Sequence, residues 1–125
     1  FEVGLNAVRA ADPDGLLIMN FTADEDEMPE MLQYAAEVMK ADVLSYDHYT
    51  RGNRSYESLA RFRAAGLAYG LPYWRYLKSY YDSDDDPLSE SDMRWNAFSG
   101  LLYGYSGHSW FLYQVESSNP DLMPA

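Results

Sequence analysis

Four apolar runs recur along the chain, and the interval between them limits the possible folds. The runs begin near Leu16, Asp42, Leu71 and His108, and a segment with helical character separates each run from the next. A parallel strand–helix–strand unit occupies roughly 30 residues, which matches this interval. The order therefore predicts parallel βα repeats, in which helices cover a parallel sheet.

The predicted strands are short and mostly apolar. They are expected over Leu16–Phe21, Ala41–Tyr49, Leu71–Ser79 and Ser109–Val115. Continuous apolar runs of this kind are typical of strands that are covered on both faces.

Helices are expected before and between these strands. Phe1–Ala11 has helical spacing, and a second helix follows Thr22–Glu27 and ends near Lys40. One apolar stripe on this second helix contains Met28, Met31, Leu32, Ala35, Val38 and Met39.

Two more helices complete the alternation. One is expected from Ser55 to Tyr69 and is stopped by Gly70. The other begins at Ser89, which together with Asp92 resembles a capping box, and ends near Tyr103. The residues expected to face the sheet are Leu59, Phe62, Gly66 and Tyr69 on the first of these helices and Met93, Ala97, Gly100, Leu101 and Gly104 on the second.

Composition removes several classes of function. The net charge of −11 and the sequence pI near 4.3 disfavour binding to nucleic acid or to an anionic membrane surface. The absence of cysteine excludes disulfides, cysteine-ligated zinc and thiol catalysis. No apolar run approaches the roughly 20 residues that span a bilayer, and no signal peptide or cofactor motif is visible.

Polar side chains gather at the end of the second predicted strand. Asp47, His48 and Tyr49 directly follow Val43–Tyr46. The carboxyl ends of parallel strands are where α/β proteins build their ligand sites. Because neighbours on a strand point to opposite faces, Asp47 and Tyr49 should point together and His48 away from them. We therefore favour Asp47 and Tyr49 as ligand-binding residues over His48.

Other candidates follow from the same geometry. Asn20 and Asp24 end the first strand, and either ligand binding or helix capping would explain them. On the third strand, Trp74 and Lys78 share a face, whereas Arg75 lies on the other and needs a partner if it is buried. Trp110 could form the floor of a sugar site or belong to the core.

Metal and nucleophile chemistry are less well supported. The aspartates between Tyr81 and Pro87 resemble the opening of an EF-hand loop, but Pro87 stands where glycine is needed and Met93 where the last glutamate should be. His48 and His108 lie in different contexts and do not suggest a zinc pair. No nucleophile-elbow motif is present.

Four such repeats without a glycine-rich phosphate turn suit half of a TIM (β/α)8 barrel, strands five to eight, better than a nucleotide-binding doubly wound domain. A small flavodoxin-like module that acts by protein contact is a weaker alternative. Residues 1–125 would then be a single partial barrel domain and a fragment of a longer chain.

Several sequence segments resemble a known family. They are Asp42–Tyr49, Leu71–Trp74, Gly100–Gly107 and Trp110–Tyr113. Together they resemble the carboxyl-terminal half of (β/α)8-barrel glycoside hydrolases of the β-galactosidase-like superfamily, whose strand six is often followed by Asp-x-Tyr and whose strand seven contains Pro-aromatic-Trp. The resemblance implies a carbohydrate ligand and favours a secreted or periplasmic location.

The chain also departs from that family. Retaining members use two carboxylates, one of which would lie upstream of Phe1. Lys78 and Ser79 stand where the nucleophilic glutamate is expected. Catalysis would therefore need an upstream half, and the alternative is a non-catalytic carbohydrate-binding or structural domain. Either an upstream half-barrel or a second copy is expected to cover the sheet.

Overall fold

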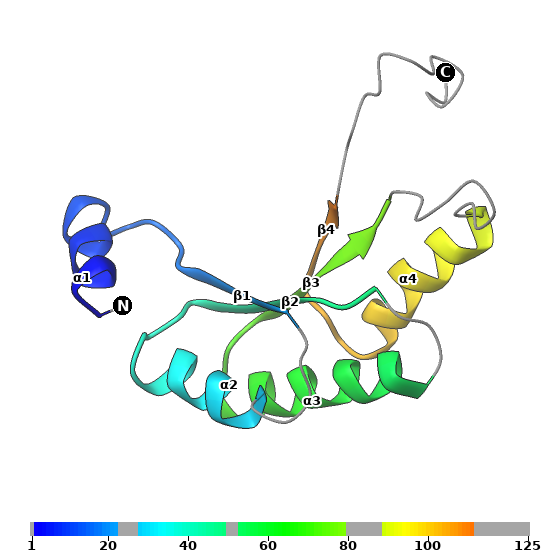
Figure 1. The fold of residues 1–125 in the computed structure, drawn as a ribbon, viewed down its shortest axis with the longest axis horizontal. Helices are drawn as coiled ribbons and strands as arrows, with labels where there is room; N and C mark the ends of the chain where they lie inside the picture. The colour runs from blue at the N-terminus through cyan, green and yellow to red at the C-terminus, as the bar shows by residue number, and fades with distance from the viewer. Residues whose placement is uncertain (1, 23–27, 50–52, 80–88, 112–125) are drawn as a thin grey trace, which may run out of the picture.

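The computed structural model describes residues 2–22, 28–49, 53–79 and 89–111. Strands and helices alternate along the chain (Figure 1). The strands are β1 (Ile18–Thr22), β2 (Val43–Asp47), β3 (Tyr73–Lys78) and β4 (Gly107–Phe111). The helices are α1 (Glu2–Ala11), α2 (Met28–Glu37), α3 (Asn53–Tyr69) and α4 (Glu90–Leu102). This confirms the predicted alternation. Residues 112–115 of the fourth predicted strand lie outside the described residues.

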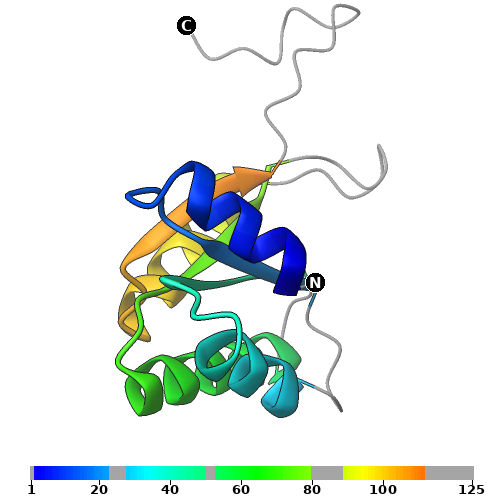
Figure 2. The same cartoon turned by 90° about the vertical axis from the view of Figure 1, so that its left-hand side faces the viewer.

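The four strands form one open parallel sheet in the order β1-β2-β3-β4, so β1 and β4 are its edges. Each crossover places a helix beside the sheet. Figure 1 shows α2, α3 and α4 on one side of it, while α1 stands apart from that layer. Figure 2 gives the same arrangement from the side. An α/β fold with parallel βα repeats is therefore present.

The hydrophobic core lies between the sheet and these helices. Its aromatic centre is Tyr46, whose ring stacks on Phe62 at 4.3 Å between centroids and lies 5.9 Å from the ring of Tyr105. The other buried members are Phe21, Met28, Leu32, Ala35, Ala41, Leu44, Leu59 and Tyr73. Strand residues alternate, so these positions mark the face that the helices cover.

Several local predictions are confirmed at the helix ends. The capping box is present: the Ser89 hydroxyl accepts from the Asp92 backbone N–H, and the Asp92 carboxylate accepts from the Ser89 backbone N–H. Gly70 follows α3 with φ of 67°, a left-handed conformation that glycine adopts without steric cost.

The predicted inner faces of the helices are partly wrong. On α4 the buried residues are Asn96, Ser99 and Gly100, whereas Met93 and Leu101 are exposed. The helix turns its polar side inward because Arg75 is buried beneath it and requires hydrogen-bond acceptors. Met31 on α2, Val38 directly after α2, and Tyr69 on α3 are likewise exposed and do not belong to the core.

Gly66 lets α3 approach the sheet closely. A Cβ atom at this position would lie 2.2 Å from Cδ1 of Tyr73 and 2.9 Å from the carbonyl oxygen of Leu71. At Gly4 in α1, by contrast, a Cβ would meet nothing within 4 Å.

We therefore expect opposite effects from the same substitution in two helices. Gly66→Ala should lower the free energy of unfolding by about 1–3 kcal/mol because the buried Tyr73 ring cannot yield. The matched control Gly4→Ala should be neutral or stabilising by up to about 1 kcal/mol because alanine favours helix. Urea unfolding followed by circular dichroism measures both. Equal effects of the two substitutions would contradict the close approach at Gly66.

Candidate functional site

The sheet has a second face, which points away from α2, α3 and α4 and which we call the far face. Its residues alternate with the core positions along each strand. They are Ile18, Asn20 and Thr22 on β1, Val43, Ser45 and Asp47 on β2, Trp74, Tyr76 and Lys78 on β3, and Gly107, Ser109 and Phe111 on β4.

Strand register aligns four oxygen-bearing side chains across the far face. Thr22 pairs with Asp47, Asp47 with Tyr76, and Tyr76 with Ser109. We call Thr22, Asp47, Tyr76 and Ser109 the oxygen row. Neighbouring strands are about 4.8 Å apart, so the row spans roughly 14 Å. It supplies three hydroxyls and one carboxylate near the carboxyl ends of all four strands.

Aromatic groups border the oxygen row on both sides. One layer toward the amino ends, the ring of Trp74 lies over Gly107, where a Cβ would come within 2.5 Å of the indole. Beyond the row, Tyr49 stacks on Phe111 with 6.2 Å between centroids and 14° between planes. The row is thus a polar strip between flat apolar surfaces, a combination that suits the hydroxyls and ring faces of a sugar.

Asp47 contributes the only carboxylate among the described residues of the far face. Its Oδ1 atom lies 3.5 Å from Nδ2 of Asn20, at the limit of a hydrogen bond. The side chain is partly exposed. A carboxylate so weakly engaged by Asn20 can accept hydrogen bonds from an incoming donor.

His48 points to the opposite side, as the alternation of side chains predicted. Its Nδ1 atom lies 2.8 Å from the hydroxyl of Ser58 on α3. The Ser58 hydroxyl also donates to the Arg54 carbonyl at 3.1 Å. In this geometry His48 ties the end of β2 to α3 and stands away from the oxygen row.

The other predicted site residues divide between the two faces. Asn20, Trp74 and Lys78 lie on the far face with Asp47 and Tyr49, and Lys78 is largely buried there. Trp110 pairs with the core residue Leu77 and therefore lies on the helix side of the edge strand. Asp24 falls outside the described residues.

Sequence reasoning missed three members of the oxygen row as site residues, Thr22, Tyr76 and Ser109. Thr22 and Ser109 carry no motif, and their common level depends on strand register. Register is fixed by the pairing of whole strands, so only the tertiary structure places these hydroxyls beside Asp47.

A buried charge lies beneath the sheet, on the helix side. Arg75 is only 1% exposed, and its guanidinium donates to the Asn96 carbonyl and side-chain oxygens at 3.3 Å and to the Ser99 hydroxyl at 3.2 Å. Its Cζ atom stands 5.9 Å from the centroid of the Tyr46 ring, within reach of a cation–π interaction. Every one of these partners is neutral.

This environment changes the protonation of neighbouring groups. Burial, and then the positive charge of Arg75, lowers the pKa of His108 below its usual range. Burial raises the pKa values of Tyr46 and Tyr105, so both phenols stay protonated at neutral pH.

Among the described residues no group of three or more acidic, histidine or cysteine side chains could hold a metal ion. No helix within the same described ranges is long and apolar enough to cross a membrane.

The lowered pKa of His108 predicts a pH-dependent loss of stability. The unfolded chain binds a proton to His108 more readily than the folded chain does, so stability is complete above about pH 6.5 and falls as the pH drops below that value. His108→Asn should remove this part of the dependence. Unfolding free energies of both chains between pH 5 and 8 measure the difference, and a proton NMR titration of His108 with a pKa at or above 6.5 would contradict it.

Comparisons with known proteins add no identity to this geometry. The chain matches no protein family, and no curated protein or solved structure is significantly similar to it. The arrangement of side chains on the far face is therefore what indicates the function of this protein.

Proposed function

We propose that this protein binds carbohydrate at the carboxyl ends of its strands. The observation that carries the proposal is the oxygen row, Thr22, Asp47, Tyr76 and Ser109, between Trp74 and the stacked rings of Tyr49 and Phe111. Sugars offer several hydroxyls at intervals of a few ångströms and apolar ring faces, and the row and its aromatic borders complement both.

The net charge of −11 favours neutral sugars over anionic ones. Lys78 lies on the same face as Asp47 and brings a positive charge toward the end of β3. The other three members of the oxygen row, Thr22, Tyr76 and Ser109, are uncharged. A neutral saccharide of two or three rings would match the roughly 14 Å that the four strands span.

The family resemblance supports the same ligand class. A half-barrel equivalent to strands five to eight of a glycoside hydrolase would contain four parallel strands in sequential order, with helices on one face and the site at the carboxyl ends. The observed open sheet agrees with that organisation. We propose a glycoside-hydrolase-like half-barrel as the finer description of the fold.

Hydrolysis requires more than the described far face provides. Glycosidases of the common kind need two carboxyl groups separated by about 5–9.5 Å, whereas Asp47 is the only carboxylate among the described far-face residues. Binding without catalysis is therefore the function that the described residues support, and an upstream half that supplied a second carboxylate would permit hydrolysis.

Binding can be tested by calorimetric titration with a panel of neutral oligosaccharides. Asp47→Asn keeps the shape of the side chain but removes its charge, so affinity for a bound sugar should fall about 10-fold, the value of a charge-assisted hydrogen bond. The matched control Asp14→Asn, in the exposed turn at the amino end of β1, should leave affinity unchanged.

Tryptophan fluorescence gives an independent readout. Of the three tryptophans, Trp74 lies on the far face, so Trp74→Phe should abolish a sugar-induced change in emission while the titration by calorimetry persists. Failure of every saccharide in the panel to bind, or equal affinity of the Asp47→Asn chain and the unaltered chain, would refute the proposal.

A further inference from the structure

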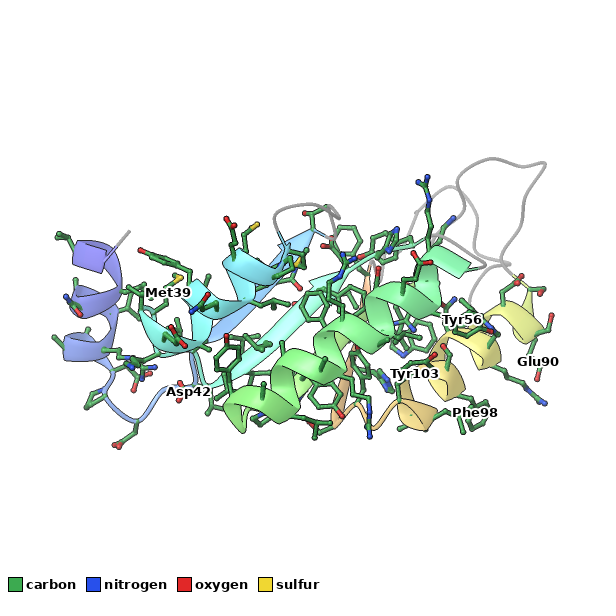
Figure 3. All side chains as sticks on the ribbon, turned by 90° about the horizontal axis from the view of Figure 1, so that it is seen from below. Met39, Asp42, Tyr56, Glu90, Phe98 and Tyr103 are labelled. Carbon is green, nitrogen blue, oxygen red and sulfur yellow. The ribbon has the colours of Figure 1, made fainter. Side chains whose placement is uncertain are left out.

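Part of the exposed apolar surface lies at the two lateral edges of the fold. At the β4 edge, Met93, Ala97 and Leu101 are spaced four residues apart along one flank of α4, and Leu101 is 55% exposed. The opposite flank of α4 faces α3, where Trp95 donates to the Tyr56 hydroxyl at 3.0 Å. Figure 3 shows Tyr56 and Tyr103 between α3 and α4 and Phe98 on the outer side of α4.

The β1 edge has a matching flank. Met31 and Tyr34 on α2 are exposed and lie on one side of the helix, and Val38, directly after its last residue, is exposed as well. Helices α2 and α4 run in the same direction relative to the sheet, so equivalent sides of the two helices face the same way. The side of α4 that is equivalent to the apolar flank of α2 faces α3, the helix that precedes α4. The apolar flank of α2 is therefore directed away from α3, toward the β1 edge.

Helix α1 has an apolar stripe and no place in the helix layer. Leu5, Val8 and Ala11 share one side at helical spacing, none of them is buried, and Val8 is 58% exposed. Figure 1 shows α1 apart from α2, α3 and α4. Within the described ranges there are thus four strands but only three helices that cover the sheet, together with one amphipathic helix whose stripe is uncovered.

We propose that two copies of this chain close into one eight-stranded parallel barrel. A two-fold axis along the barrel places β4 of each copy beside β1 of the other with all strands parallel, which satisfies both open edges at once. At each of the two junctions, β4 of one copy lies beside β1 of the other. Helix α1 of that other copy then covers the junction from outside, between the apolar flank of α4 of the first copy and the apolar flank of its own α2.

The chain can supply this arrangement without breaking strong contacts. Helix α1 joins β1 through residues 12–17, and turning it toward the helix layer disrupts the ion pair between Arg9 and Asp42 and the hydrogen bond that Arg9 donates to the Lys40 carbonyl. Both side chains are about one-third exposed, and ion pairs at the surface contribute little to stability. Burial of the exposed Val8 and Leu101 side chains offsets that loss, because both remove apolar surface from water.

Closure would also complete the ligand site, and this part of the inference rests on the proposed function. Beyond Ser109 and Phe111 on β4, the next strand would be β1 of the second copy with Asn20 and Thr22 on its far face. The oxygen row would then continue around the whole mouth of the barrel, and the second copy would supply a second Asp47.

Light scattering coupled to size exclusion tests the barrel directly with the 125-residue chain. The expected mass is twice 14.3 kDa at a concentration of about 100 μM, and the dimer should tighten as salt rises because both copies are strongly acidic. Val8→Asp and Leu101→Glu should each give monomers. Asn6→Asp, which adds the same charge on the polar side of α1, should remain dimeric. Both exposed positions tolerate substitution in the monomer, and circular dichroism verifies folding.

A monomer of the unaltered chain at this concentration would overturn the inference, as would a dimer that survives either Val8→Asp or Leu101→Glu. The carbohydrate proposal is tested separately by the saccharide titration. A dimer that binds no sugar would leave the barrel standing and remove the ligand, whereas a monomer that binds sugar would do the reverse.

Discussion

The attachment of α4 to the sheet depends on the buried guanidinium of Arg75. The residues that α4 buries are Asn96, Ser99 and Gly100, and they offer hydrogen-bond acceptors and space in place of apolar bulk. Arg75 donates to two oxygens of Asn96 and to the Ser99 hydroxyl. A buried charge without such acceptors would cost several kilocalories per mole. The inward-facing positions of α4 therefore carry hydrogen-bond acceptors for Arg75 where apolar side chains would otherwise pack.

The burial of Arg75 also affects β4 and the outer side of α4. Gly100 is required because His108 lies against it, with Nε2 of His108 within 2.3 Å of the place a Cβ would occupy. His108 pairs with Arg75 across β3 and β4 and stays neutral because of burial and the nearby charge. With its inner side polar, α4 carries its apolar residues on the outside, and the exposed flank of Met93 and Leu101 follows from the burial of Arg75.

The sequence was sufficient for the order and type of the elements. Apolar runs at a regular interval predicted four strands that alternate with helices. The alternation of side chains along a strand predicted that His48 would lie on the opposite face from Asp47 and Tyr49. It failed where a long-range partner decided the outcome. The inner face of α4 was predicted from apolar spacing, but Arg75, which is 21 residues earlier than Asn96, reverses it. Thr22 and Ser109 entered the site only through register.

The two faces of the sheet therefore have separate requirements, and the alternation of side chains keeps them independent. Core positions on β2 and β3 hold Tyr46, Arg75 and their helix partners, while the intervening far-face positions are released from packing against helices. A site formed by far-face side chains can vary in chemistry without disturbing the attachment of the helices. The same alternation makes the far face depend on what closes the sheet, because a parallel sheet with helices on one side leaves its other face and both edges to be satisfied by further structure.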